Sequence, residues 1–141
     1  MKNVLKILQP YWAEKCPNQW NWPPAENYYE WYALYASLVK PDRILEIGAL
    51  FGWSIMAFLV GWPRIKEILV IDNELYGASL TETVERIRGF CRNQGFEVPH
   101  IRAMIGDSIV MAKVGALKNE APFDLIHVDG EHSATAVRSD T

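Results

Sequence analysis

The sequence predicts an α/β fold in which helices cover both faces of a parallel β-sheet, with a helical, aromatic-rich arm at the N-terminus. From residue 43 onwards, short apolar runs rich in β-branched residues alternate with segments of helical periodicity. Strands separated by helices in this way are joined by right-handed crossovers and pair in parallel. The 141 residues are enough for one hydrophobic core.

Four strands are predicted, at 43–49 (RILEIGA), 67–72 (EILVID), 100–106 (HIRAMIG) and 123–129 (FDLIHVD), and the first two are expected to be buried. Each is a short and mainly apolar run. A strand that is covered on both faces needs such a run rather than a strict alternation of apolar and polar residues. Three helices are expected between these strands, at 53–60, 79–93 and 108 to about 118.

The clearest of these helices is 79–93, which is amphipathic and begins with a capping box of Ser79 and Glu82. Its three arginines, Arg86 among them, are expected to lie on the solvated face and to pair with neighbouring glutamates. Cys91 belongs to the buried stripe of the helix, so its thiol is expected to be inert.

The first forty residues are expected to form an N-terminal helical arm, followed by the sheet domain at 41–141. Most of the chain's six tryptophans and six tyrosines lie in this arm. One short helix is predicted before Pro10, then an irregular stretch, then a helix at 24–40 that Pro41 ends. The arm could close over a substrate as a lid, or it could simply cover the sheet.

Ligands of parallel sheets bind beyond the carboxyl ends of the strands, and the first two strand ends carry suitable residues. The first strand contributes Glu46 and a turn with Gly48 and Gly52, where glycine lets the backbone approach a ligand. The helix that follows offers backbone N–H donors. Asp72 ends the second strand, twenty residues beyond Gly52, at the spacing of a carboxylate that accepts hydrogen bonds from a ribose diol.

The last two strands end in acidic residues as well. Asp107 and Ser108 follow the third strand, where Asp107 could accept a bond from an exocyclic amine. Asp129 and His132 follow the fourth strand. Any of these aspartates could instead cap the helix that follows it. His127, inside the fourth strand, is expected to be a core histidine with its hydrogen bonds satisfied.

In this order, the segments ILEIGALFGWS, VIDNE, IGDS and FDLIHVDGEHS resemble the motifs of the class I S-adenosylmethionine-dependent methyltransferases, which have a Rossmann-like sheet. The resemblance is greatest to the branch in which an Asp-Gly-acidic-His-Ser turn ends the fourth strand, and it covers about residues 35 to 138. Leu50 replaces the middle glycine of the commoner first turn. Such enzymes continue through three more strands, so the domain at 41–141 is expected to be incomplete at its C-terminus.

The resemblance implies O-methylation of a small hydroxylated molecule. It assigns six residues to S-adenosylmethionine: Glu46, Gly48, Gly52, Asp72, Asp107 and Ser108. In this assignment the first three line the methionine and ribose part, Asp72 holds the ribose hydroxyls, and Asp107 meets the adenine amine. Asp129 and His132 would be the catalytic residues, with Asp129 facing the reacting centre or binding a divalent cation such as Mg²⁺, and His132 acting as a base.

Composition limits the partners. A net charge of −3 provides no basic surface for nucleic acid or an anionic membrane, and two distant cysteines fit a reduced, cytoplasmic protein. An uncovered edge at the fourth strand would favour a homo-oligomer. Two other interpretations stay open: a cofactor-binding module that is non-catalytic or truncated, and a nicotinamide dinucleotide-binding domain.

Overall fold

The computed structural model describes residues 3–13, 28–74, 77, 79–120 and 122–129. Its centre is a four-stranded sheet in which all neighbouring strands are parallel, in the order β3-β2-β1-β4. The strands are β1 Arg43–Ile47, β2 Glu67–Asp72, β3 His100–Ile105 and β4 Leu125–Val128. All four predicted strands are therefore confirmed. The chain proceeds from β1 outward to β3 and then returns to the far side of β1, so the strand order reverses between β1 and β4.

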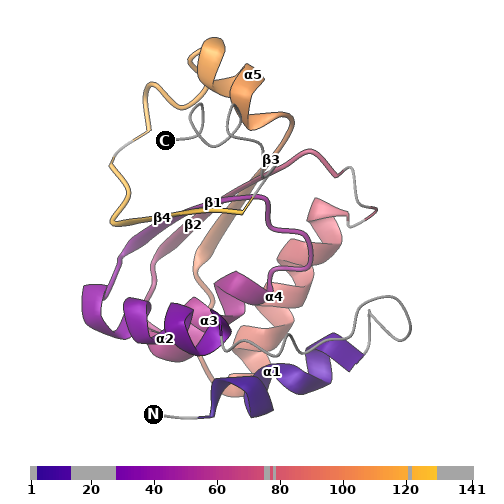
Figure 1. Cartoon of the computed structure of the whole chain (residues 1–141), viewed down its shortest axis with the longest axis vertical. Helices are drawn as coiled ribbons and strands as arrows, with labels where there is room; N and C mark the ends of the chain where they lie inside the picture. Colours follow the sequence, from indigo (N-terminus) through magenta and orange to yellow (C-terminus); the bar gives the residue numbers. More distant parts are fainter. Residues whose placement is uncertain (1–2, 14–27, 75–76, 78, 121, 130–141) are drawn as a thin grey trace.

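Helices lie on both faces of this sheet, as predicted (Figure 1). The larger layer contains α1 Val4–Ala13, α2 Tyr28–Val39, α3 Trp53–Gly61 and α4 Leu80–Gln94. The opposite face carries the short helix α5 Ser108–Lys113, which connects β3 to β4. This division follows from right-handed crossovers, because the connections to β2 and β3 run in one direction along the sheet and the connection to β4 runs in the other. In the part of the chain described here, no helix is long and apolar enough to cross a membrane.

Alternating strand residues supply two apolar cores. Ile44, Ile68 and Ile101 face the larger helical layer and pack with buried residues of α1 to α4. Leu45 and Leu69 point the other way and pack with residues around α5. Both faces of the central strands are therefore buried, which explains why β1 and β2 are continuous apolar runs rather than alternating ones.

Two predicted helix ends are wrong. Helix α1 does not stop before Pro10 but continues to Ala13. Proline cannot donate the backbone bond to the carbonyl four residues earlier, yet Val4 and Leu8 of the same helix are fully buried in the core, and this packing outweighs the lost bond. Helix α5 ends at Lys113 rather than near residue 118. Gly115 takes a left-handed φ of 69° two residues later, which ends the helix.

The pairing of α2 with α3 is unusually close. A Cβ atom placed on Gly61, the last residue of α3, would lie 1.9 Å from the carbonyl oxygen of Ala33 in α2. Only a glycine allows this approach of the two backbones. The predicted helix at 24–40 is described from Tyr28 onwards, and its expected start lies outside the described residues.

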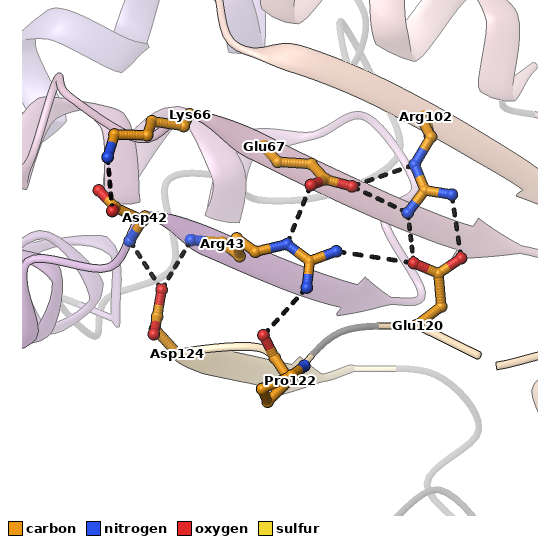
Figure 2. A network of polar contacts seen from close by, with 8 residues as sticks. All are labelled: Asp42, Arg43, Lys66, Glu67, Arg102, Glu120, Pro122 and Asp124. Carbon is orange, nitrogen blue, oxygen red and sulfur yellow. Dashed lines mark hydrogen bonds and ion pairs between the residues drawn. The ribbon is translucent and has the colours of Figure 1, made fainter. Parts of the chain in front are cut away.

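A network of charged groups lies at the end of the sheet where the strands begin (Figure 2). Arg43 and Arg102 both bind the Glu67 carboxylate, at 2.9 and 2.8 Å, and Arg102 also binds Glu120. The bond with Arg43 lowers the pKa of Glu67, and Arg102 lowers it further. The Asp124 carboxylate accepts the backbone N–H groups of residues 42 and 43. The segment before β4 is thereby tied to β1 and β2.

Candidate functional site

The turn between β1 and α3 bends through three left-handed residues, Gly48 (φ 83°), Leu50 (φ 44°) and Gly52 (φ 79°). The two glycines adopt this conformation without strain, whereas leucine rarely does. Leu50 thus keeps the backbone conformation expected of a glycine at its position in the commoner motif. Gly52 is the N-cap residue of α3 and makes no side-chain bond to it, so no N-cap side chain occupies the first backbone N–H groups of the helix.

Asp72, the last residue of β2, organises this turn. Its Oδ2 accepts the backbone N–H of Ala49 at 2.9 Å and that of Leu50 at 3.0 Å, and its Oδ1 accepts the N–H of Glu74 at 2.7 Å. The sequence suggested this carboxylate as a ribose ligand. The structure places it at the predicted strand end, where it also binds two backbone amides of the neighbouring turn.

The Glu46 carboxylate is fully buried under the same turn. Its Oε1 accepts a short bond from the hydroxyl of Ser54, at the start of α3, and its Oε2 lies 3.0 Å from Nδ1 of His127 in β4. Burial raises the pKa of Glu46, although the bond with His127 opposes that rise. Glu46 was expected near the methionine amino group of the cofactor or near the backbone of the turn. In the structure its two oxygens contact Ser54 and His127, which joins β1 to α3 and β4.

His127 is the core histidine that its place in a strand predicted. Burial alone would lower its pKa, but the bond with Glu46 and the charges of Glu46 and Asp129 raise it. Its ring lies 4.7 Å from the ring of Tyr32 in α2 and 5.5 Å from that of Phe58 in α3, measured between centroids. An aromatic cage and a carboxylate thus fix the imidazole at the point where the strand order reverses.

Tyr32 is a site residue that the sequence did not single out. Burial, and then the charges of Asp129 and Glu46, raise its pKa to about 12. Its hydroxyl therefore stays protonated near the acidic end of β4. The only signal in the sequence was the general richness of the arm in aromatic residues. The packing of α2 against α3 is what brings this particular ring to the carboxyl edge.

The remaining predicted residues lie at the ends of β3 and β4. Asp107 caps α5, because its Oδ1 accepts the N–H groups of Ile109 at 2.8 Å and Val110 at 3.1 Å, and the alternative role as a helix cap is thus confirmed. Ser108 follows as the first residue of α5, partly buried. Asp129 continues the pairing of β4 with β1 through its N–H, which donates to the Ile47 carbonyl at 2.8 Å.

His132, the predicted base, lies outside the described residues. Within the described ranges, no three histidine, cysteine, aspartate or glutamate side chains come together as a metal site would require. The described residues therefore provide no complete metal site around Asp129, and one carboxylate is too few oxygen donors for Mg²⁺.

Helix α4 contacts the turn from the outside. The prediction that Arg86 is a solvated residue paired with glutamate is wrong: its Nη1 donates to the Phe51 carbonyl at 3.3 Å, and its guanidinium lies 5.6 Å from the Phe51 ring centre. Arg88 does pair with Glu85, at 2.5 Å. Helical spacing alone could not tell these two arginines apart, because the difference depends on where the turn lies. Cys91 is buried, as its place in the apolar stripe predicts, and burial raises the pKa of its thiol to about 11.

A family of methyltransferase domains matches residues 45–141, which include all four strand ends. The chain belongs to this methyltransferase family. The match begins in β1 and covers the turn at 48–52, Asp72, Asp107 and the segment after β4. No curated protein is similar enough in sequence to this chain to count as a match.

Solved methyltransferase structures share the fold of this chain. The O-methyltransferase TomG from Streptomyces achromogenes, in complex with S-adenosylmethionine, superposes with a TM-score of 0.59 at 19% identity, over 92% of this chain and 53% of its own. An O-methyltransferase from Bacillus cereus gives 0.57 at 18% identity, over 90% and 53%. The methyltransferase PaMTH1 from Podospora anserina gives 0.60 at 22% identity, over 99% and 55%. This chain thus spans about half the length of these structures, and at such identities the likeness establishes the fold.

Proposed function

We propose that this protein binds S-adenosylmethionine at the carboxyl ends of β1 and β2 and transfers its methyl group to a hydroxyl of a small molecule. The observation that carries the proposal is the left-handed turn at 48–52, with two of its amides held by Asp72, in a member of a methyltransferase family. The three structures compared above were solved with S-adenosylmethionine or S-adenosylhomocysteine, and two of them are O-methyltransferases.

In this proposal each strand end has its part of the cofactor. Gly48 and Gly52 leave room for the methionine and ribose part, and Glu46 lies near the methionine amino group or the backbone of the turn. The Asp72 carboxylate keeps lone pairs for the ribose hydroxyls beside its bonds to the turn. Asp107 uses Oδ1 to cap α5, and no described residue bonds its Oδ2, which is thus available to the adenine amine with Ser108 beside it.

Methyl transfer is an in-line displacement. The acceptor oxygen forms a bond to the methyl carbon while the carbon–sulfur bond breaks, and that electron pair goes to sulfur, which leaves S-adenosylhomocysteine. The protein has to align donor and acceptor and receive the hydroxyl proton. His132 is the proposed base and Asp129 the residue that faces the reacting centre. Both follow β4 in the sequence, and in that strand the ring of His127 packs against the ring of Tyr32.

A divalent cation at Asp129 stays a prediction, and no step of the proposed mechanism depends on it. A cation there would lower the pKa of the acceptor hydroxyl and orient it. The described residues supply too few oxygen ligands for such a site.

Calorimetry with S-adenosylmethionine and S-adenosylhomocysteine tests the proposal. Wild type is expected to bind both. Asp72→Ala is expected to weaken binding by more than about tenfold, because it removes the ribose contact and frees two amides of the turn. Asp42→Ala is the matched control, since Asp42 pairs with Lys66 at the opposite edge of the sheet. Absence of heat with both ligands for the wild type would refute the proposal.

The other interpretations have tests of their own. The family match favours methyl transfer over a nicotinamide dinucleotide domain, and a fluorescence titration with a reduced nicotinamide dinucleotide is expected to show no saturable change. A module that binds the cofactor without turnover would show a heat of binding with S-adenosylmethionine in calorimetry. It would release no S-adenosylhomocysteine when mixed with S-adenosylmethionine and any hydroxylated acceptor. Association into a homo-oligomer stays a prediction for light scattering at micromolar concentration. A cytoplasmic location stays a prediction as well.

A further inference from the structure

We propose that Thr83 of α4 is a positioning residue for the cofactor turn, because its hydroxyl holds the backbone of Leu50 in the left-handed conformation. The inference rests on the function proposed above, in which the turn at 48–52 binds S-adenosylmethionine. It concerns a residue thirty-three positions away from the turn in the sequence.

Both polar groups of the Leu50 backbone are held by other elements. Its carbonyl accepts the Thr83 hydroxyl at 2.6 Å, and its N–H donates to Asp72 Oδ2 at 3.0 Å. Thr83 is fully buried. Leu50 is 37% exposed, so packing covers its side chain only in part. The two hydrogen bonds thus hold the Leu50 backbone on both sides of its Cα, where φ is 44°.

Helix α4 contacts the turn at two more points. One turn after Thr83, Arg86 donates to the Phe51 carbonyl. A Cβ atom placed on Gly52 would lie 3.1 Å from Thr83 Cγ2 and 3.0 Å from the Ile87 side chain. The same face of α4 therefore lies against the last three residues of the turn, Leu50 to Gly52, which makes α4 an outer wall for the cofactor site.

This clamp compensates for the missing glycine. A glycine enters the left-handed region without strain, whereas a leucine there is strained because its Cβ crowds the backbone. Without the Thr83 bond, Leu50 is expected to relax toward negative φ, which would turn the amides of Ala49 and Leu50 away from Asp72. The Thr83 hydroxyl is therefore needed when residue 50 is leucine and largely dispensable when it is glycine.

A double-mutant cycle tests this dependence, with S-adenosylhomocysteine affinity from calorimetry as the readout. Thr83→Val, which keeps the shape of the side chain and removes the hydroxyl, is expected to weaken binding by about tenfold. In a Leu50→Gly background the same substitution is expected to weaken binding by less than about threefold. Thr83→Ser keeps the hydroxyl and is expected to stay within about twofold of wild type. Cys91→Ala, a fully buried change two turns further along α4, is expected to leave the affinity unchanged.

An equal loss from Thr83→Val in both backgrounds would overturn the inference, and so would wild-type affinity in a folded Thr83→Val protein. The same cycle is also measured as melting temperature without ligand. There, Thr83→Val is expected to lower Tm more in the wild-type background than in the Leu50→Gly background, by at least about 2 °C. If wild type binds neither ligand, the proposed function fails, and the melting cycle still decides whether Thr83 holds Leu50.

Discussion

Replacing Gly61 with alanine is expected to separate α2 from α3 and to destabilise the fold. The new Cβ would lie 1.9 Å from the Ala33 carbonyl oxygen, 2.7 Å from its carbonyl carbon and 2.8 Å from its Cα, whereas ordinary contact begins at 3.4 Å. The two helices would have to move apart by about 1.5 Å. All three neighbours are backbone atoms, so no side-chain rotation can relieve the contact.

The size of the effect follows from this geometry. Overpacking in a closely packed core costs about 1–3 kcal/mol, and the rigid neighbour places Gly61→Ala near the upper end. Alanine recovers up to about 1 kcal/mol of helix propensity, which leaves a net loss of about 2 kcal/mol. For a chain of this length the corresponding drop in Tm is about 7 °C.

Gly89→Ala is the matched control. Gly89 lies inside α4, and a Cβ placed there meets no atom within 4 Å. Alanine gains helix propensity without a clash, so Tm is expected to rise by about 2–3 °C. Thermal and urea denaturation followed by circular dichroism measure both variants. The reasoning is refuted if Gly61→Ala stays within about 0.5 kcal/mol of wild type, or if both substitutions shift stability in the same direction.

The displacement should also reach the site. Tyr32 precedes Ala33 in α2, and its ring lies 4.7 Å from His127. An outward shift of α2 therefore loosens the aromatic cage around the imidazole. Under conditions in which Gly61→Ala is still folded, we expect a broadened His127 ring signal in its NMR spectrum. Gly89→Ala is expected to leave that signal sharp.

Two further predictions concern buried and shared charges. Because Arg43 and Arg102 lower the pKa of Glu67 from 4.5, its stabilisation is complete above that value and is lost as pH falls through the lower folded-state pKa. Glu67→Gln should thus lower the free energy of unfolding by about 1 kcal/mol near neutral pH and by less as the solution becomes acidic. Urea titrations at several pH values measure this loss. A loss that does not change with pH would contradict the prediction. His127→Phe keeps the aromatic packing but leaves the buried Glu46 carboxylate without its bond to the imidazole, which should lower the free energy of unfolding by about 3 kcal/mol. Adding Glu46→Gln to this variant should restore part of the loss, because it removes the unpaired charge. If the double variant is no more stable than His127→Phe in denaturation experiments, the pair is not the cause of the loss.

Local signals in the sequence were sufficient to predict the helices and strands and the order in which the polar strand ends follow one another. The apolar runs of β1 and β2 predict that both faces of these strands are covered, as the structure shows. Ser79 caps α4 by accepting the Glu82 N–H, as the capping-box pattern predicts. Asp72 likewise stands at a strand end because it is the residue that follows the apolar run of β2. Such features depend on neighbours within a few positions, which the sequence displays.

Tertiary structure alone decided which side chains meet. Glu46 and His127 are 81 positions apart and touch because they occupy the same register of paired strands, while Leu50 and Thr83 meet because α4 packs beside the turn. The continuation of α1 through Pro10 has the same origin, since burial of distant surfaces outweighed a local rule. Register and helix packing are set by the summed contacts of the whole core, so no local pattern contains them.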